Sequence, residues 1–103
     1  DHSHDEFESI VVELPEQTDP ADFAARVERL ANEQNILRVK GYVAIEGKPM
    51  RLLVQAVGAR VRHQFDRPWK PEEGRQGKVV VIAEHDNINS DAIRAALAGE
   101  LVD

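Results

Sequence analysis

The sequence has 103 residues, of which 42% are hydrophobic and 31% charged, so it fits one small globular domain rather than a disordered or fibrous chain. It contains no cysteine, which excludes disulfides, thiolate metal sites, iron–sulfur clusters and cysteine nucleophiles. No apolar run approaches the ~20 residues that cross a bilayer, and the acidic opening of the chain is unlike a signal peptide. We therefore expect a cytoplasmic protein with no membrane partner.

Charge is distributed unevenly along the chain, although the net charge is only −6. Residues 1–35 carry a net charge of −8, residues 36–80 one of +6, and residues 81–103 one of −4. The basic middle can form one face that meets an acidic partner surface or a phosphate. The alternative is that strands present basic outer faces while helices present acidic ones.

The first predicted elements are a strand and a helix. Apolar residues alternate over residues 7–14, which is typical of a strand. Asp19 and Pro20 mark a helix start, because Asp19 can accept from free backbone N–H groups and proline at the first helical position needs none. The helix should run to about Glu33. Its apolar stripe consists of Phe23, Val27, Leu30 and Ala31.

Three further strands are predicted to form a meander. They cover residues 36–45 and 50–57 and, after a turn at Gly58, a stretch in which Val61, His63 and Phe65 share a face. The first of these strands should direct two sets of side chains to opposite faces. The expected buried set is Leu37, Val39, Val43 and Ile45, and the expected outer set is Arg38, Lys40 and Tyr42.

The last third of the chain predicts a loop, a strand and a helix. Residues 66–77 are rich in proline and glycine and read as a loop, in which Trp69 is either a lid over the sheet edge or a partner-contact anchor. The β-branched run of residues 78–83 is typical of a central strand. Asn89 and Gly99 are placed to cap a second helix. Its expected buried side is Ala92, Ile93, Ala96 and Leu97.

The expected fold is therefore α+β, in the order β-α-β-β-β-β-α. It has a single, largely antiparallel sheet of four to five strands, with two helices packed mainly on one face. The pattern leaves the order of the strands within the sheet open.

The sequence lacks the common catalytic and nucleotide-binding motifs. There is no GxxxxGK[ST], GxGxxG, HExxH or GxSxG, so we expect no enzyme activity from this chain by itself. His2 and His4 stand among carboxylates and can offer ligands to a divalent metal, but two ligands on a flexible tail should bind loosely, and a disordered acidic tail is the alternative. His63 is expected at a core or edge position of its strand, and His85, between Glu84 and Asp86, in an exposed loop; a role as metal ligand is the alternative for each.

Four segments together resemble a known family. They are Asp5-Glu6-Phe7-Glu8-Ser9, the run Ile36-Leu37-Arg38-Val39-Lys40-Gly41-Tyr42-Val43, the run Gly47-Lys48-Pro49-Met50-Arg51-Leu52-Leu53-Val54-Gln55, and Phe65-Asp66-Arg67-Pro68-Trp69. They resemble the C-terminal domain of the CobW family of GTP-dependent metallochaperones, and the resemblance covers nearly the whole chain. Its most specific parts are the Arg-x-Lys-Gly segment and the tryptophan loop.

The resemblance implies an intact protein with an N-terminal P-loop GTPase domain and a cysteine-rich metal motif, often joined to the C-terminal domain by a His-rich linker. Residues 1–6 would then end that linker and residues 7–103 would form the C-terminal domain. It further implies cobalt or zinc and GTP-Mg for the intact protein, with none of them a cofactor of this fragment. The implied role is cobalt delivery to a cobaltochelatase-type client in cobalamin biosynthesis, while related members handle zinc.

On this basis a rigid sheet with a basic face is the expected contact surface for the GTPase domain or the metal-receiving client. The residues expected to make that contact are Arg38, Lys40, Arg67, Trp69 and Lys70. A module that binds single-stranded nucleic acid or another anionic partner is the alternative, opposed by the net charge of −6 and by the presence of only five aromatic residues. An independent small enzyme is a third possibility.

Overall fold

The structure is a computed structural model that describes residues 7–84 and 88–99. Within these residues the chain forms strands and helices in the predicted order. One short 3-10 helix lies in the connection between the fourth and fifth strands. The elements are β1 (Phe7–Leu14), α1 (Pro20–Gln34), β2 (Ile36–Val43), β3 (Met50–Val57), β4 (Arg60–Pro68), the 3-10 helix η2 (Pro71–Glu73), β5 (Gly77–Glu84) and α2 (Ser90–Ala98).

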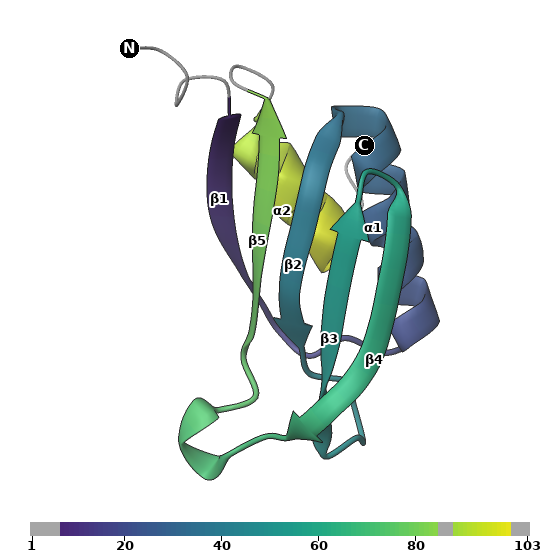
Figure 1. The fold of residues 1–103 in the computed structure, drawn as a ribbon. Helices are drawn as coiled ribbons and strands as arrows, with labels where there is room; N and C mark the ends of the chain where they lie inside the picture. Colours follow the sequence, from purple (N-terminus) through teal and green to yellow (C-terminus); the bar gives the residue numbers. More distant parts are fainter. Residues whose placement is uncertain (1–6, 85–87, 100–103) are drawn as a thin grey trace.

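The strands form one five-stranded sheet in the order β1-β5-β2-β3-β4, and all their pairings are antiparallel (Figure 1). β2, β3 and β4 follow one another as the predicted meander. β5, the last strand along the chain, lies between β1 and β2 and pairs with both. This position agrees with the predicted central strand, and its inward side chains Val79, Val81 and Ala83 are fully buried.

Both helices cover the same face of the sheet, as predicted (Figure 1). The expected stripe of α1 is buried, and so are Ile93 and Leu97 of α2, while Ala92 and Ala96 are only half-buried. They pack with the inward residues of the strands into one core. Burying a side chain such as Phe23 or Leu97 contributes roughly 1.5–3 kcal/mol relative to leaving it exposed. We call the uncovered side of the sheet the open face.

The helix ends follow the predicted local signals. The Asp19 carboxylate accepts from the backbone N–H of Asp22 at 2.9 Å, and Asn35, whose φ of 55° is left-handed, caps the C-terminus of α1. The Asn89 side chain accepts from the N–H of Ala92 at 3.1 Å, and α2 ends at Gly99. These bonds satisfy N–H groups that the first turn of a helix leaves free.

The strands differ from the prediction in three main respects. β2 ends at Val43 instead of residue 45, although Ile45 is buried as expected. A β-bulge between Ile36 and Arg38 places Ile36 in the core and leaves Leu37 half-buried, so Leu37 does not belong to the buried set. β4 continues through Asp66 and Arg67 to Pro68, because a second register shift keeps it paired with β3 beyond Phe65. The predicted loop therefore begins only at Trp69.

Arg26 ties the helical layer together, which sequence analysis did not anticipate. Its guanidinium donates to the carbonyl oxygen of Leu97 at 2.8 Å and to Oε1 of Gln17 at 2.6 Å. Gln17 is buried and accepts this bond while its backbone pairs with Ala44 and Glu46. One arginine thus links α1, the end of α2 and the connection that leads out of β1.

Among residues 7–84 and 88–99, no helix is long and apolar enough to cross a membrane.

The seam between β2 and β5 requires glycine at position 41. A Cβ atom built on Gly41 would lie 2.5 Å from the Cα of Val79 and closer still to the carbonyl oxygen of Lys78. Both are backbone atoms of β5, so neither can move aside without displacing the strand. The absence of a side chain at Gly41 therefore lets the central pair of strands close.

We predict that Gly41→Ala lowers the free energy of unfolding by about 1–3 kcal/mol, the usual effect of overpacking a closed core. Urea unfolding followed by fluorescence of the single tryptophan measures it. Gln55→Ala on the neighbouring strand is the matched control, because Gln55 is exposed and its truncation should change stability by less than about 0.5 kcal/mol. Equal stability of the two variants would contradict the steric argument.

Candidate protein-contact surface on the open face

The open face has an apolar floor at its centre. Strand alternation directs Leu53 and Val57 of β3, and Val80 and Ile82 of β5, to this side of the sheet. A sheet with one face in water normally carries polar residues at such positions. Val57 is 58% exposed, and Val11 of β1 extends the apolar surface with 50% exposure.

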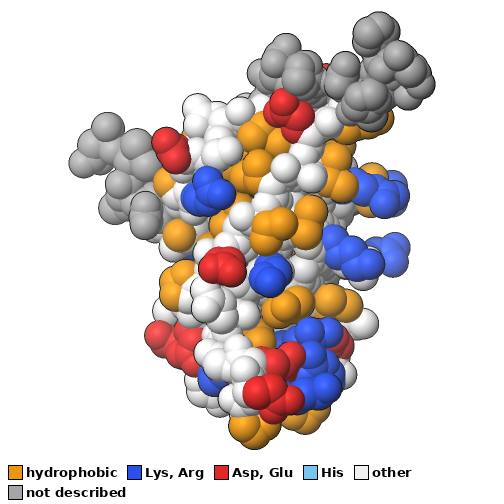
Figure 2. Space-filling model, turned by 90° about the vertical axis from the view of Figure 1, so that its left-hand side faces the viewer, with side chains coloured by type: hydrophobic (Ala, Val, Ile, Leu, Met, Phe, Trp, Pro, Cys, Tyr) orange, Lys and Arg blue, Asp and Glu red, His pale blue; other side chains and the backbone are white. Residues whose placement is uncertain are grey.

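The floor lies in a shallow hollow of about 630 Å³ centred on β2, which we call the open-face hollow. Arg38, Lys40, Arg51 and Lys78 line it, and no carboxylate of residues 7–84 or 88–99 does. Arg38, Lys40 and Lys78 are exposed, and within the part of the chain that the structure describes they form no ion pair. Figure 2 shows basic side chains projecting from the right-hand side of the molecule, which is the open face, beside hydrophobic surface. The hollow is therefore an apolar floor with a basic rim.

Tyr42 closes one end of the hollow and holds two neighbours. The Trp69 ring packs edge-on against the Tyr42 ring with 5.7 Å between centroids, and the Arg51 guanidinium lies 4.5 Å above the same ring. Arg51 also binds Asp66 through two parallel hydrogen bonds of 2.9 Å. The Arg51 bond holds the pKa of the Asp66 carboxyl below its usual range. The Arg51 guanidinium is thus already paired within the domain, unlike Arg38, Lys40 and Lys78 in the described residues.

The loop after β4 is fixed by a second arginine–carboxylate pair. Arg67 donates to both carboxylate oxygens of Glu73, at 2.9 and 2.6 Å, and the backbone N–H of Lys70 donates to Glu73 at 2.7 Å. These bonds lower the pKa of Glu73 to about 2, and the bond from Arg67 has the larger effect. The same bond raises the pKa of Arg67. The Trp69 backbone N–H is also held, by the carbonyl oxygen of Pro49 at 3.0 Å.

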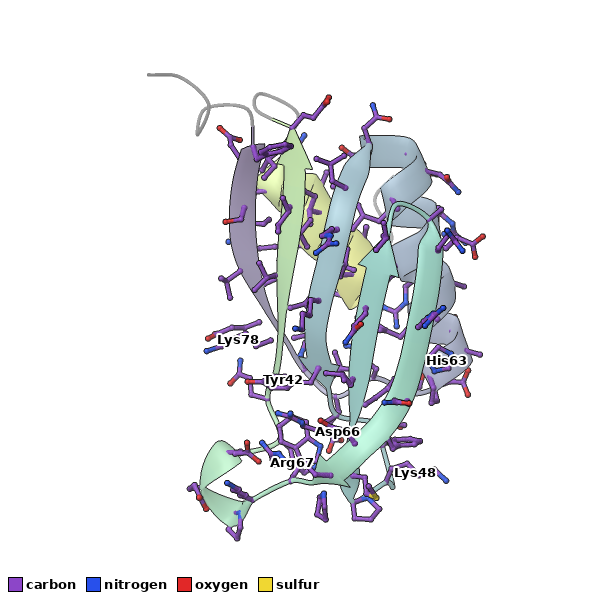
Figure 3. All side chains as sticks on the ribbon, in the orientation of Figure 1. Tyr42, Lys48, His63, Asp66, Arg67 and Lys78 are labelled. Atoms are coloured by element: carbon purple, nitrogen blue, oxygen red, sulfur yellow. The ribbon has the colours of Figure 1, made fainter. Side chains whose placement is uncertain are left out.

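The structure brings the predicted contact residues onto one surface in two groups. Arg38 and Lys40 project from the open face of β2, as expected. Arg67, Trp69 and Lys70 lie at the end of the sheet, next to Tyr42, and Figure 3 shows Tyr42, Asp66 and Arg67 together there. Arg38, Lys40 and Tyr42 occupy alternate positions on β2, so one strand connects the two groups.

Sequence analysis included Arg51 and Lys78 in the basic middle of the chain but not among the expected contact residues, and it missed the apolar floor. Two signals were present. Val80 and Ile82 continue an apolar run on β5 at positions that alternation assigns to the outer face, and Leu53 and Val57 do the same on β3. Only the strand order β3-β2-β5 shows that these residues surround the same segment of β2.

Of the four histidines, the structure describes only His63. His63 is exposed on the edge strand β4, away from the Tyr42 group, which agrees with an edge position (Figure 3). His2, His4 and His85 lie outside the described residues. In the described ranges, no three His, Asp or Glu side chains gather closely enough to hold a metal ion.

Because the pKa of Glu73 is depressed in the folded state, the Arg67–Glu73 pair stabilises the loop above the ordinary carboxyl pKa of about 4.3 and is lost as pH falls toward about 2. We predict that carboxyl NMR titration gives Glu73 a midpoint near 2, and that Arg67→Gln raises this midpoint. In thermal unfolding the wild type should lose more stability than Glu73→Gln between pH 5 and pH 2. Glu72→Gln is the control, since it removes a carboxylate from the same turn and leaves the pair intact. A Glu73 midpoint above 4 in the wild type would exclude the pair in solution.

Comparison with known proteins identifies the domain. The family model described as "Cobalamin synthesis protein cobW C-terminal domain" matches residues 7–101. The zinc chaperone CobW of Sinorhizobium sp. is 48% identical over 97 residues, which cover 94% of this chain and 27% of the relative. The zinc chaperone CobW of Pseudomonas aeruginosa is 46% identical over 93 residues, which cover 90% of this chain and 23% of the relative.

A solved structure shares the fold as well as the sequence. The Zn(II)-bound YjiA GTPase from Escherichia coli superimposes with a TM-score of 0.69 at 34% identity, over 94% of this chain and 30% of that one. The chain thus spans about a quarter of the length of the curated relatives it matches. The predicted resemblance is confirmed, and the chain belongs to the family of CobW C-terminal domains.

Proposed function

We propose that this chain is the C-terminal partner-contact domain of a metal-chaperone GTPase, and that its open face is the surface that meets another protein. The observation that carries the proposal is the open-face hollow, whose apolar floor and basic rim stand uncovered beside a fully packed core. Exposed apolar surface rimmed by charge is typical of a protein-binding site.

The metal-chaperone part of the proposal is supported by the relatives. Two of them carry the name zinc chaperone, and the solved structure is a Zn(II)-bound GTPase. All are several times longer than this chain, and the solved structure is named a GTPase, so we propose that GTP binding and hydrolysis belong to an N-terminal domain of the intact protein. We propose zinc as the transported metal, since the two relatives are named zinc chaperones. The family description names cobalamin synthesis but no metal, so cobalt delivery is the second candidate.

A separate rigid surface has a clear use in such a protein. GTP hydrolysis can act on a client only if the nucleotide state changes a second surface or its position. In our proposal Arg38 and Lys40 supply the exposed charges of that surface, and the loop with Arg67, Trp69 and Lys70 borders it. The partner is the GTPase domain of the same chain or the protein that receives the metal.

We predict that the double substitution Arg38→Glu and Lys40→Glu, in the protein encoded by the complete reading frame, abolishes zinc-limited growth rescue of a deletion strain. The two reversals change the rim charge by four units where no described carboxylate compensates it. Basal GTP hydrolysis by the purified protein measures whether the nucleotide site is intact.

The matched control is Arg29→Glu with Arg94→Glu, because both arginines are exposed on the helical side and the change in net charge is identical. This control should rescue growth like the wild type. A reading frame without a GTP-binding domain would refute the metal-chaperone assignment. Equal rescue by both double variants would refute the role of the open face.

A further inference from the structure

We infer that the open-face hollow binds an acidic amphipathic α-helix of a partner protein. This inference rests on the proposed function and deepens it by naming the chemistry of the partner. Three properties of the hollow lead to it: its apolar floor, the sign of its rim, and the pairing of the strand beneath it.

The floor requires a partner with apolar side chains. β5 carries Val79 and Val81 into the core and Val80 and Ile82 onto the open face, so it is apolar on both sides. That pattern is typical of a strand buried on both faces, yet this chain covers only one of them. An apolar stripe of a second molecule would cover the exposed half of β5 and the adjoining Leu53 and Val57.

The rim requires that the flanks of this stripe be acidic. Arg38 and Lys40 lie on β2, and Lys78 of β5 lies beside Tyr42 of β2 (Figure 3). The three basic side chains are exposed, and none has an ion-pair partner in the described ranges. Arg51 is different, because Asp66 already neutralises it. Three cations without an ion pair thus border a floor whose described lining includes no carboxylate, although the exposed Glu13 of β1 lies opposite Lys78 in the register of β1 and β5. Carboxylates on the partner would complement them and accelerate association.

The pairing of β2 favours a helix over an extended peptide. β2 is hydrogen-bonded to β3 on one side and to β5 on the other, so the floor offers no free backbone N–H or C=O groups. A strand laid on it would bury its own polar backbone without partners, whereas a helix satisfies its backbone internally.

The dimensions agree with a helix of about two turns in contact. Arg38 and Tyr42 are four residues apart on one strand, which spans about 13 Å, and β3 and β5 lie about 10 Å apart across β2. An α-helix is about 10 Å wide and rises 5.4 Å per turn. A bound helix would add the layer that this sheet lacks.

The test is a titration of the chain with a blocked peptide of about 14 residues that carries leucine at i, i+3, i+4 and i+7, with glutamate on both flanks of the stripe. Trp69 reports the binding, because it is the only tryptophan and packs against Tyr42 at the end of the hollow. A second peptide replaces every glutamate by lysine, and a third scrambles the acidic sequence so that no stripe forms.

We expect the acidic peptide to bind about tenfold more tightly than the lysine peptide, the combined effect of three partly screened ion pairs. Arg38→Glu with Lys40→Glu should remove that preference, while Arg29→Glu with Arg94→Glu should keep it. Val57→Gln should weaken binding of the acidic peptide without unfolding the domain, since this side chain is 58% exposed.

Two outcomes overturn the inference. One is equal or absent binding of the acidic, lysine and scrambled peptides, with amide shifts that miss Arg38 to Tyr42 in the NMR spectrum. The other is tighter binding of single-stranded oligothymidylate than of the acidic peptide, with the steep salt dependence of phosphate contacts, which would make the rim a nucleic-acid site. Neither outcome bears on the zinc-limited growth assay, so the proposed function stands or fails separately.

Discussion

The position of β5 between β1 and β2 is the constraint on which the rest of the structure depends. β1 has no other strand neighbour, so it belongs to the sheet only because β5 pairs with it. The same strand closes against Gly41 of β2, where the two backbones approach so closely that no side chain fits. With β5 between β1 and β2 the sheet has five strands, and the two helices cover one face of it. The outward residues of β5 lie on the opposite face, which no described helix covers.

The local parts of the fold could be predicted because their causes are local. Asp19 and Asn89 cap helices through bonds to N–H groups three residues away, and the stripe of α1 follows from its own spacing. The insertion of β5 between β1 and β2 could not be predicted, because these strands are distant in sequence. The alternation of apolar and polar residues along a strand does not indicate which strands it pairs with. The bulge that moves Leu37 out of the core is likewise a property of two neighbouring strands. Pro68 suggested a loop, but it lies at an edge strand's end, where proline is tolerated.

The candidate site likewise has parts that could be predicted from a single strand and parts that required the strand order. Arg38 and Lys40 could be assigned to an outer surface from alternation on one strand. Arg67 was predicted as a contact residue without its partner, although Glu73 holds it with both oxygens. The hollow itself needed the strand order, since its floor is assembled from β3 and β5 on either side of β2. A chemical surface built across strands is therefore visible only after the topology is known.

The insertion of β5 also orders events during synthesis. β2, β3 and β4 are consecutive, so this meander can pair as soon as residue 68 has left the ribosome. β1 precedes the meander in the chain, but its partner β5 ends only at Glu84, so their antiparallel ladder joins segments that are far apart in the sequence. Closing so long a loop costs entropy before any contact rewards it. During translation β1 therefore has no strand partner until β5 has been made, after nearly all of the described domain.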